Sequence, residues 1–372
     1  MMAERAAMHR ATGGARRRVA LACIALIAFI ISLLVAEGAL RIAGGAPPPG
    51  VFTVTAREYA RSPGIFAPNQ VVLDRPGTKF AQTLHINSLG YRGREFERAK
   101  PTGEFRIVFA GDSFTWGHNV ADGETTPAQL ETALASSCGR VTVVNAGLSG
   151  TSITGQDSLV LRALELAPDL VVLMYHENDI DDLMYSPVWH QLSENRRRKS
   201  QFPLSLIYPV VRTSALWNLA LDVRRKLTSP HVPQSAETRL DAAAVTEEVV
   251  AARAAYSAQL ASLARQLGER GLPFLFVTFP HPASVRDGAG ARDYEWMVAE
   301  AARLAIPAVD LLPVLRASRL GPEGAYLIPD DYHPSAAGHA LAARTIADRV
   351  LAMRAADAPA GSCRLATAPV AE

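Results

Sequence analysis

The stretch "IVFAGDSFTWG", residues 107–117, joins an apolar run of strand character to a tight Gly-Asp-Ser turn. Apolar runs of the same kind recur along the chain, and helical patterns separate them. The runs are FRIVFA (105–110), VTVVNA (141–146), DLVVLMY (169–175), PFLFVTF (273–279) and PAVDL (307–311), and the helical patterns lie near 124–137, 154–166, 241–269, 291–304 and 335–353. Continuous apolar strands between helices are typical of a parallel sheet covered on both faces. The sequence therefore predicts an α/β doubly wound body.

Length and charge set the outer bounds. With 372 residues, about half of them apolar, the chain is long enough to bury a substantial core. The 38 basic and 36 acidic residues nearly cancel, so no global charge points to a nucleic-acid partner, and we predict none.

The N-terminal region predicts a membrane segment. Arg16, Arg17 and Arg18 precede "VALACIALIAFIISLLVA", residues 19–36, which is long enough to cross a bilayer as a helix. The basic residues before it predict a cytoplasmic N-terminus and a periplasmic or extracellular body. A cleaved signal peptide is the competing interpretation, because Ala36 and Ala39 are small. We favour an uncleaved anchor, since the apolar run exceeds the usual length of a signal peptide's core.

These patterns divide the chain into six regions. We expect a basic N-terminus (1–18), a transmembrane anchor (19–36), a Pro- and Gly-rich linker (37–50), a small β-containing pre-domain (51–104), the main domain (105–353) and a loose tail (354–372). The main domain carries a long insertion, 183–240, in which Pro209 and Arg212 argue against a second membrane span. It is either an amphipathic cap or membrane-facing flap, or an ordinary packed insertion.

Two cysteines, Cys138 and Cys363, belong to the body, whereas Cys23 lies in the apolar segment. An oxidising compartment would permit Cys138 and Cys363 to pair and so to pin the tail to the domain. Two unrelated free thiols are the alternative.

Polar residues follow the predicted strands, where ligands of parallel sheets gather. Ser113 is the candidate nucleophile and His333 the candidate base, because a serine hydroxyl needs a group that takes its proton. Asp330, three residues before His333, is the candidate carboxylate that orients the imidazole. The Ser113 amide, the Gly150 amide and the Asn178 side chain are candidate oxyanion donors. Ser113 as a mere helix cap is the simpler alternative.

Four blocks in this order, "GDSFTWG", "NAGLSG", "END" and "DDYHPSAAGH", resemble the SGNH, or GDSL-type, hydrolase superfamily of esterases, lipases and carbohydrate deacetylases. The upstream "NSLGYRG" (87–93) is similar to the lead-in of its membrane-anchored bacterial members. The resemblance implies a flavodoxin-like three-layer α/β/α sandwich with a parallel sheet, here preceded by an N-terminal transmembrane helix. It implies the roles given above for Ser113, Gly150, Asn178, Asp330 and His333.

The third block departs from that family, because His176 stands where a glycine is usual. His176 either contacts substrate or is a packed, hydrogen-bonded histidine, and the second is favoured. His281 either lines the substrate pocket or is structural, and His339 is expected to be packed inside the last helix. Asp112 is expected to shape its turn and Asp331 to cap the following helix. No cluster in the sequence has metal-ligand spacing, so we predict no metal and no cofactor.

The sequence thus favours a membrane-anchored serine esterase that removes an acetyl or short acyl group from a glycan or lipid through an acyl-enzyme. An O-acyltransferase that modifies an envelope polysaccharide and a non-catalytic binding module are the alternatives.

Overall fold

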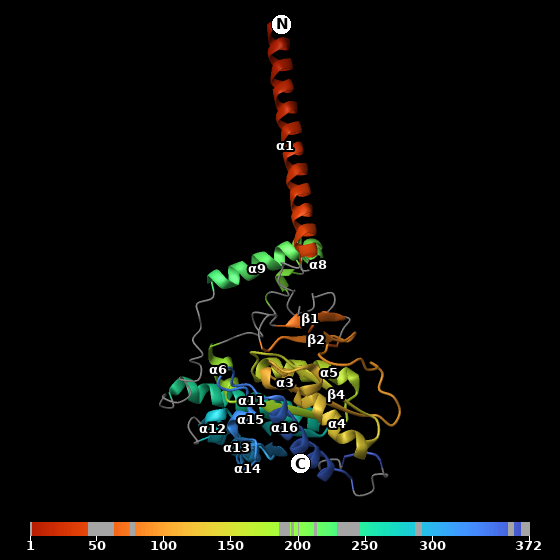
Figure 1. Cartoon of the computed structure of the whole chain (residues 1–372), viewed down its shortest axis with the longest axis vertical. Coiled ribbons are helices and arrows are strands. Elements are labelled where there is room, and N and C mark those ends of the chain that lie inside the picture. Colours follow the sequence, from red (N-terminus) through yellow and green to blue (C-terminus); the bar gives the residue numbers. More distant parts are fainter. Residues whose placement is uncertain are drawn as a thin grey trace. The chain divides into compact units, whose positions relative to one another are not determined.

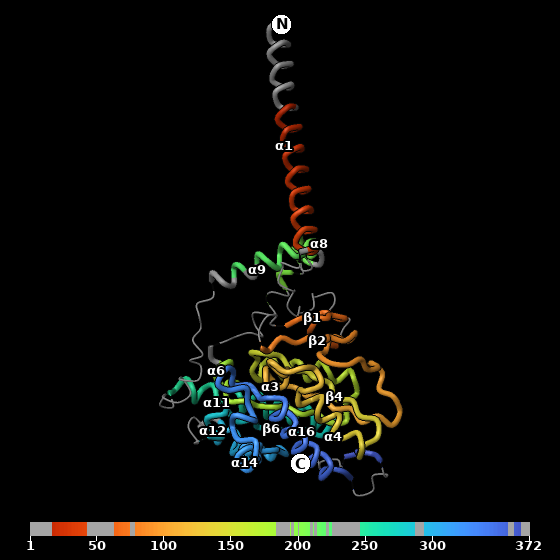
Figure 2. Tube along the Cα trace, viewed as in Figure 1, coloured from red at the N-terminus to blue at the C-terminus, as the bar shows by residue number. Residues whose placement is uncertain are grey.

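A computed structural model describes residues 2–43, 63–74, 79–185, 194, 197–199, 201–211, 214–228, 246–286, 292–355 and 361–365 (Figures 1 and 2). The chain forms two compact units. The helical unit comprises Met1–Pro49 and Ser205–Val232, and the sheet unit comprises Gly50–Leu204 and Pro233–Glu372. Half of the predicted linker (44–50), the start of the predicted pre-domain (51–62), and much of the insertion and tail lie outside the described residues.

The sheet unit is built on five parallel strands in the order β4-β3-β5-β6-β7. They are β3 (Phe105–Gly111), β4 (Val141–Gly147), β5 (Leu170–Tyr175), β6 (Phe274–Thr278) and β7 (Ala308–Asp310). Counted from β3, this is the order 2-1-3-4-5 of flavodoxin-like sheets, in which the order of strand addition reverses between the first and third strands. The predicted α/β fold is confirmed, and the reversal falls between β3 and β5.

Helices cover both faces of this sheet (Figure 1). Strand β3 shows why its sequence is continuously apolar: Ile107 and Phe109 pack into the core on one face, and Val108 and Ala110 into the core on the other. The first core includes residues of α4 (Thr126–Cys138), α14 (Leu312–Ala317) and α16 (Ala336–Ala352). The second includes residues of α5 (Ile153–Ala163) and α11 (Glu247–Gly268). The remaining elements are η1 (Asp122–Glu124), η2 (Leu164–Leu166), α6 (Asn178–Tyr185), α12 (Pro282–Arg286), α13 (Arg292–Arg303) and α15 (Gly321–Ala325).

A hairpin precedes this sheet within the same unit. Strands β1 (Gln70–Asp74) and β2 (Gln82–Ile86) pair antiparallel, with Gln70 opposite Ile86. The "NSLGYRG" segment then turns, because Asn87 Oδ1 accepts the N–H groups of Leu89 and Tyr91 at 3.0 Å. The following residue, Arg92, bridges to Asn145 of β4, so this segment packs against the edge of the parallel sheet.

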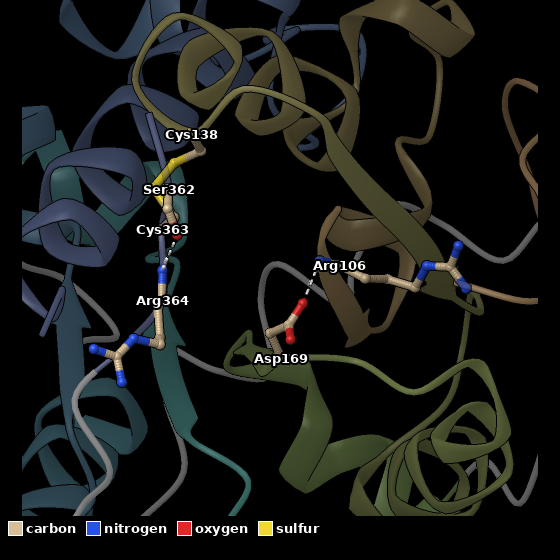
Figure 3. Close-up of a disulfide and its surroundings, with 6 residues drawn as sticks. All are labelled: Arg106, Cys138, Asp169, Ser362, Cys363 and Arg364. Atoms are coloured by element: carbon tan, nitrogen blue, oxygen red, sulfur yellow. Dashed lines mark hydrogen bonds between the residues drawn. A yellow bond between two sulfur atoms is a disulfide. The ribbon is translucent and has the colours of Figure 1, made fainter. Parts of the chain in front are cut away.

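The two body cysteines form a disulfide (Figure 3). It joins Cys138, the last residue of α4, to Cys363, and the backbone bridge Arg354–Leu365 holds the same tail segment. Of the two alternatives for these cysteines, the structure contains the bonded one. Residues 361–365 are thereby fixed to the body, although the sequence predicted a loose tail from 354 onward.

The helical unit contains α1 (Met2–Ala43), α8 (Leu204–Val211) and α9 (Ala215–Thr228). Within α1, Arg17–Ile42 is long and apolar enough to cross a membrane, and it is the one such helix among the described residues. The helix continues through residues 37–43, which the sequence assigned to a linker. An anchor and a signal sequence both fit this helix by length and composition.

Candidate active site

Ser113 is the first residue of α3 (Ser113–Trp116), which begins directly after β3. The cap of this short helix is Asp112, whose Oδ1 accepts the Phe114 N–H at 2.9 Å. The Ser113 hydroxyl is therefore not the capping group. Gly147 at the end of β4 permits the close approach of α3, because a Cβ there would lie 2.3 Å from the Trp116 nitrogen.

The fold brings His333 to Ser113 across 220 positions of sequence. Nε2 of His333 lies 2.8 Å from Ser113 Oγ, and Nδ1 lies 2.5 Å from Asp331 Oδ1. With Nδ1–H donating to the carboxylate, Nε2 presents its lone pair to the serine hydroxyl. All three side chains are largely removed from solvent. In this hydrogen-bonded series of serine, histidine and aspartate, the histidine can act as a base and take the serine proton.

The carboxylate that bonds to His333 is Asp331 and not Asp330, the residue that the sequence predicts. Asp331 Oδ1 also accepts the backbone N–H of His333 at 2.9 Å. This bond forms a turn in which the aspartate side chain accepts a hydrogen bond from the backbone two residues later. This turn places its carboxylate beside the imidazole. Asp330 instead pairs with Lys79 and is about half exposed. The expected capping role of Asp331 falls to Ser335, whose Oγ accepts the Gly338 N–H of α16.

Asn119 holds the other oxygen of the same carboxylate. Its side-chain N–H donates to Asp331 Oδ2 at 2.8 Å, whereas His333 bonds to Oδ1. Hydrogen bonds to both oxygens hold the carboxylate in one orientation. Asn119 adopts the left-handed backbone conformation (φ 62°), which asparagine tolerates better than most residues. The neighbouring His118 ring lies 4.5 Å from the His333 ring. Neither residue is among the candidates that the sequence indicates.

Arg92 fixes the backbone that carries Asn119. Its guanidinium is almost fully buried and donates to the carbonyl oxygens of Trp116, Gly117 and Val120 at 2.6–2.8 Å. Asp122 compensates its charge at 2.7 Å. The "NSLGYRG" segment thus contacts the loop that follows the nucleophile helix. The sequence indicated that this segment is similar to a family lead-in, but it did not indicate this contact.

The expected oxyanion donors lie at two other strand ends. Gly150 follows β4 and has a positive φ of 71°, a conformation that favours glycine. Asn178 opens α6 after β5, and its amide nitrogen donates to Asp182 Oδ2 at 3.3 Å and bonds to Asp112. Asn178 is therefore a neighbour of the residue that caps the nucleophile helix.

Carboxyl groups near Asn178 carry an electrostatic cost. Burial raises the pKa of Asp112, although the Phe114 N–H opposes the shift. Burial and the charge of Asp112 raise the pKa of Asp179 well above its usual value. The same two causes raise the pKa of Asp182 to about 7. In contrast, burial of Asp331 is outweighed by its hydrogen bonds to His333 and by the His333 charge, and its pKa falls below the ordinary value.

His176 is a packed, hydrogen-bonded residue. Its Nδ1 donates to the Phe279 carbonyl at 2.9 Å, and its ring stacks on Phe114 at 3.7 Å. Burial and the neighbouring His281 lower the pKa of His176 well below its usual value, so the ring is neutral at pH 7. Its bulk fills the space beside the nucleophile helix.

His281 makes a structural contact and also lines a cavity. Its Nδ1 accepts the Ala283 N–H at the start of α12, which is a structural contact. It also lines a cavity of about 380 Å³ together with Arg286, Glu323 and Ile328. The His281 ring lies 5.7 Å from the Tyr332 ring, which stacks on His333 at 4.5 Å, so the cavity borders the site. His339, as predicted, is packed, with Nδ1 2.7 Å from Thr126 Oγ1.

Folding creates one group of ligand atoms that the sequence spacing did not show. Among the described residues, His118, Asp331 and His333 offer atoms within 4.8 Å of one another and could hold a metal ion. Asp331 and His333 already bond to each other, and His333 bonds to Ser113. A metal ion on these atoms and the serine–histidine–aspartate chain therefore exclude one another.

The fold and the site together define a class: an α/β protein with a hydrogen-bonded serine, histidine and aspartate at the carboxyl edge of a parallel sheet. Residues 109–341, more than half of the chain, match the GDSL-like Lipase/Acylhydrolase family. The protein belongs to this family and is a hydrolase acting on ester bonds. The resemblance noted in the sequence is thus confirmed.

The solved structures that match the chain include a G-D-S-L family protein and an esterase. A lipolytic protein of the G-D-S-L family from Desulfitobacterium hafniense DCB-2 is 16% identical, with a TM-score of 0.38 over 66% of this chain and 98% of its own. TesA is 16% identical, with a TM-score of 0.40 over 66% and 97%. An acetyl-xylooligosaccharide esterase from Geobacillus Stearmophilus is 18% identical, with a TM-score of 0.38 over 66% and 93%. At such identities and scores the likeness says nothing about substrate. No curated protein matches the chain.

Proposed function

We propose that Ser113 is the nucleophile of a serine esterase, with His333 as its base and Asp331 as the carboxylate that orients the base. The observation that carries this proposal is the continuous hydrogen-bonded chain Ser113 Oγ, His333 Nε2, His333 Nδ1, Asp331 Oδ1. A serine placed in this way loses its proton to the imidazole as it attacks a carbonyl carbon.

The reaction would run through an acyl-enzyme. Ser113 Oγ bonds to the acyl carbon while His333 Nε2 takes its proton, and the alcohol leaves with that proton. Water then attacks the acyl carbon, gives a proton to His333, and the proton returns to Ser113 as the acid leaves. Asp331 stabilises the imidazolium in both halves. The proposed oxyanion donors are the Ser113 amide, the Gly150 amide and the Asn178 side chain, which would turn one N–H from its carboxylate partners toward the substrate oxygen.

The proposed substrate is an acetyl or short acyl ester on a glycan or lipid. The proposed location is an uncleaved anchor with its N-terminus in the cytoplasm and the sheet unit periplasmic or extracellular. The basic residues before the apolar helix support this orientation, and the Cys138–Cys363 disulfide supports an oxidising compartment.

A fluorophosphonate probe followed by peptide mass spectrometry tests the nucleophile and its activation together. We expect the label on Ser113, and no label on this peptide in Ser113→Ala or His333→Ala. A label on another serine would overturn the assignment.

Chromogenic esters of increasing acyl length, with and without an oligosaccharide acceptor, test the reaction and its substrate class. Rapid turnover of the acetyl ester in water supports the esterase. Turnover that requires the acceptor would instead identify an O-acyltransferase, which uses the same residues.

A further inference from the structure

Helices α8 and α9 expose apolar side chains that a water-soluble surface would normally bury. On α8, Leu206 is 70% and Ile207 is 48% exposed; on α9, Trp217 is 42% and Val223 is 47% exposed. Several exposed apolar side chains of this size on neighbouring helices indicate a contact with another apolar phase or partner. The question is which partner covers them.

Glu37 ties the start of α9 to the end of α1. Its carboxylate accepts the backbone N–H groups of Ala215 and Leu216 at 2.9 and 3.0 Å, and the Ser214 hydroxyl at 2.8 Å. A carboxylate that satisfies the first N–H groups of a helix is a stabilising cap. Here the cap comes from another helix, so α9 cannot begin far from residue 37.

The position of Glu37 along α1 places that junction at a membrane surface. At 1.5 Å per residue, a hydrocarbon core of about 30 Å takes about 20 residues. Counted from Val19, the first residue after the arginines, it ends near Gly38. Glu37 therefore falls at the edge of the hydrocarbon core, and its ion-pair partner Arg41 falls in the headgroup region.

The composition of α9 suits the same region. Trp217 is an amphipathic aromatic residue, a type enriched where membranes meet water, and Arg224 is exposed on the same helix. Figure 1 shows α9 running across the direction of α1 rather than along it, and the contacts of α9 with α1 place the two helices together. Helix α8 ends at this junction, because the Ser214 N–H donates to the carbonyl oxygen of Val211, its last residue, at 3.0 Å. A helix in this orientation lies in the plane of a bilayer that α1 crosses.

We infer that α8 and α9 form a platform that lies in the lipid headgroup region on the side of the membrane where α1 ends. The platform inserts Leu206, Ile207, Trp217 and Val223 among the upper acyl chains, as interfacial amphipathic helices do. This inference rests on retention of α1 as an anchor, which is part of the proposed function. Cleavage after Ala39 would remove the Glu37 cap, so the same junction argues for retention.

The test uses the full chain reconstituted in phosphatidylcholine/phosphatidylglycerol vesicles whose lipids carry bromine on the upper acyl chain. Bromine quenches tryptophan fluorescence at short range, so a decrease relative to unbrominated vesicles reports insertion. We expect Trp217→Phe to lose most of the decrease seen in the wild type. Trp296→Phe, a change on α13 in the sheet unit, is the matched control and is expected to keep it. Equal quenching in the wild type and Trp217→Phe would overturn the inference.

A second variant tests the junction. Glu37→Gln removes the charge from the α9 cap without changing its size, and we expect it to weaken quenching of Trp217. Intact-mass measurement of the membrane-extracted protein separates the two proposals. A mature chain that begins after Ala36 or Ala39 would refute the anchor and with it the platform. A complete chain without Trp217 quenching would refute the platform alone and leave the anchor standing.

Discussion

The sheet unit and the helical unit treat their side chains in opposite ways. In the sheet unit, buried charges have close partners: Arg92 bonds to three carbonyls and Asp122, and Asp331 bonds to His333 and Asn119. In the helical unit, large apolar side chains of α1, α8 and α9 face outward. The first pattern is typical of a body that folds in water around a polar site, and the second of a surface that contacts another apolar phase or partner. We therefore expect substitutions in the sheet unit to change catalysis and substitutions in the helical unit to change membrane contact.

Ser113→Ala is expected to have the largest effect, a loss of catalysis without a loss of the fold. Loss of one member of such a catalytic chain costs on the order of 10^4-fold or more in kcat, because the nucleophile is absent. Ester turnover by the purified full chain measures this, and Tm checks the fold. The matched control is Ser158→Ala on α5, which should keep wild-type turnover. Equal loss in both variants would show a general defect rather than a nucleophile.

Replacement of each of the two neighbouring aspartates by asparagine gives the next largest expected change in kcat. Asp331→Asn should lower kcat by roughly 10^3- to 10^4-fold, because the amide favours the wrong imidazole tautomer and cannot stabilise the imidazolium. Asp330→Asn removes a surface pair with Lys79, which is worth about 0–1 kcal/mol, and should change kcat only slightly. A reversed ranking of the two variants would restore the sequence-based assignment of Asp330.

Removal of the disulfide tests the stability of the sheet unit alone. The double variant Cys138→Ser/Cys363→Ser should lower the free energy of unfolding by about 2–4 kcal/mol, because it releases a constraint on the unfolded chain. Thermal unfolding in detergent measures the change, with Cys23→Ser as the control for loss of a thiol. An unchanged Tm in the double variant would mean that the tail contributes no stability.

Asn119→Gly sharpens the assignment of Asp331. The variant keeps a residue suited to the left-handed backbone and removes the hydrogen bond to the carboxylate, which is worth about 1.5–3 kcal/mol for a charged acceptor. We expect kcat to fall roughly 10- to 100-fold with KM nearly unchanged. A change confined to KM would argue that Asn119 contacts substrate instead of positioning Asp331.

Asp182→Asn should have the smallest effect, and it depends on pH. Folding raises the pKa of Asp182 from 3.8 to about 7, so between these values the folded state holds a proton that the unfolded chain has lost. Stability therefore falls as pH rises through this window. The variant should be more stable than the wild type by about 1–2 kcal/mol at pH 8 and similar to it at pH 4. Equal stabilisation at both pH values would exclude this cause.

Much of the fold follows from the sequence because it rests on local patterns. The apolar runs give the five parallel strands, and residues that follow strands in such a sheet gather at one edge, which is how Ser113 and His333 could be paired. The choice between Asp330 and Asp331 could not be made this way, because both are within reach of His333 along the chain. A backbone turn, in which the His333 N–H bonds to Asp331, decides it.

Asn119 and Arg92 were missed for a related reason. Each acts through a contact between distant segments: Asn119 reaches Asp331 across 212 positions, and Arg92 reaches the carbonyls after α3 from the turn at 87–93. No local period or spacing encodes these contacts. The cue for Arg92 was the motif that contains it, and the cue for Asn119 was its place in a tight loop directly after the nucleophile block.

The burial of Arg92 also bears on where the protein can be cut for production in the laboratory. The matched family region begins at residue 109, and a recombinant fragment trimmed to that limit would lack Arg92. The carbonyls of Trp116, Gly117 and Val120 would then lose their shared donor inside the folded body. A soluble fragment should therefore start upstream of the first hairpin strand at Gln70, well ahead of the boundary that homology alone would suggest.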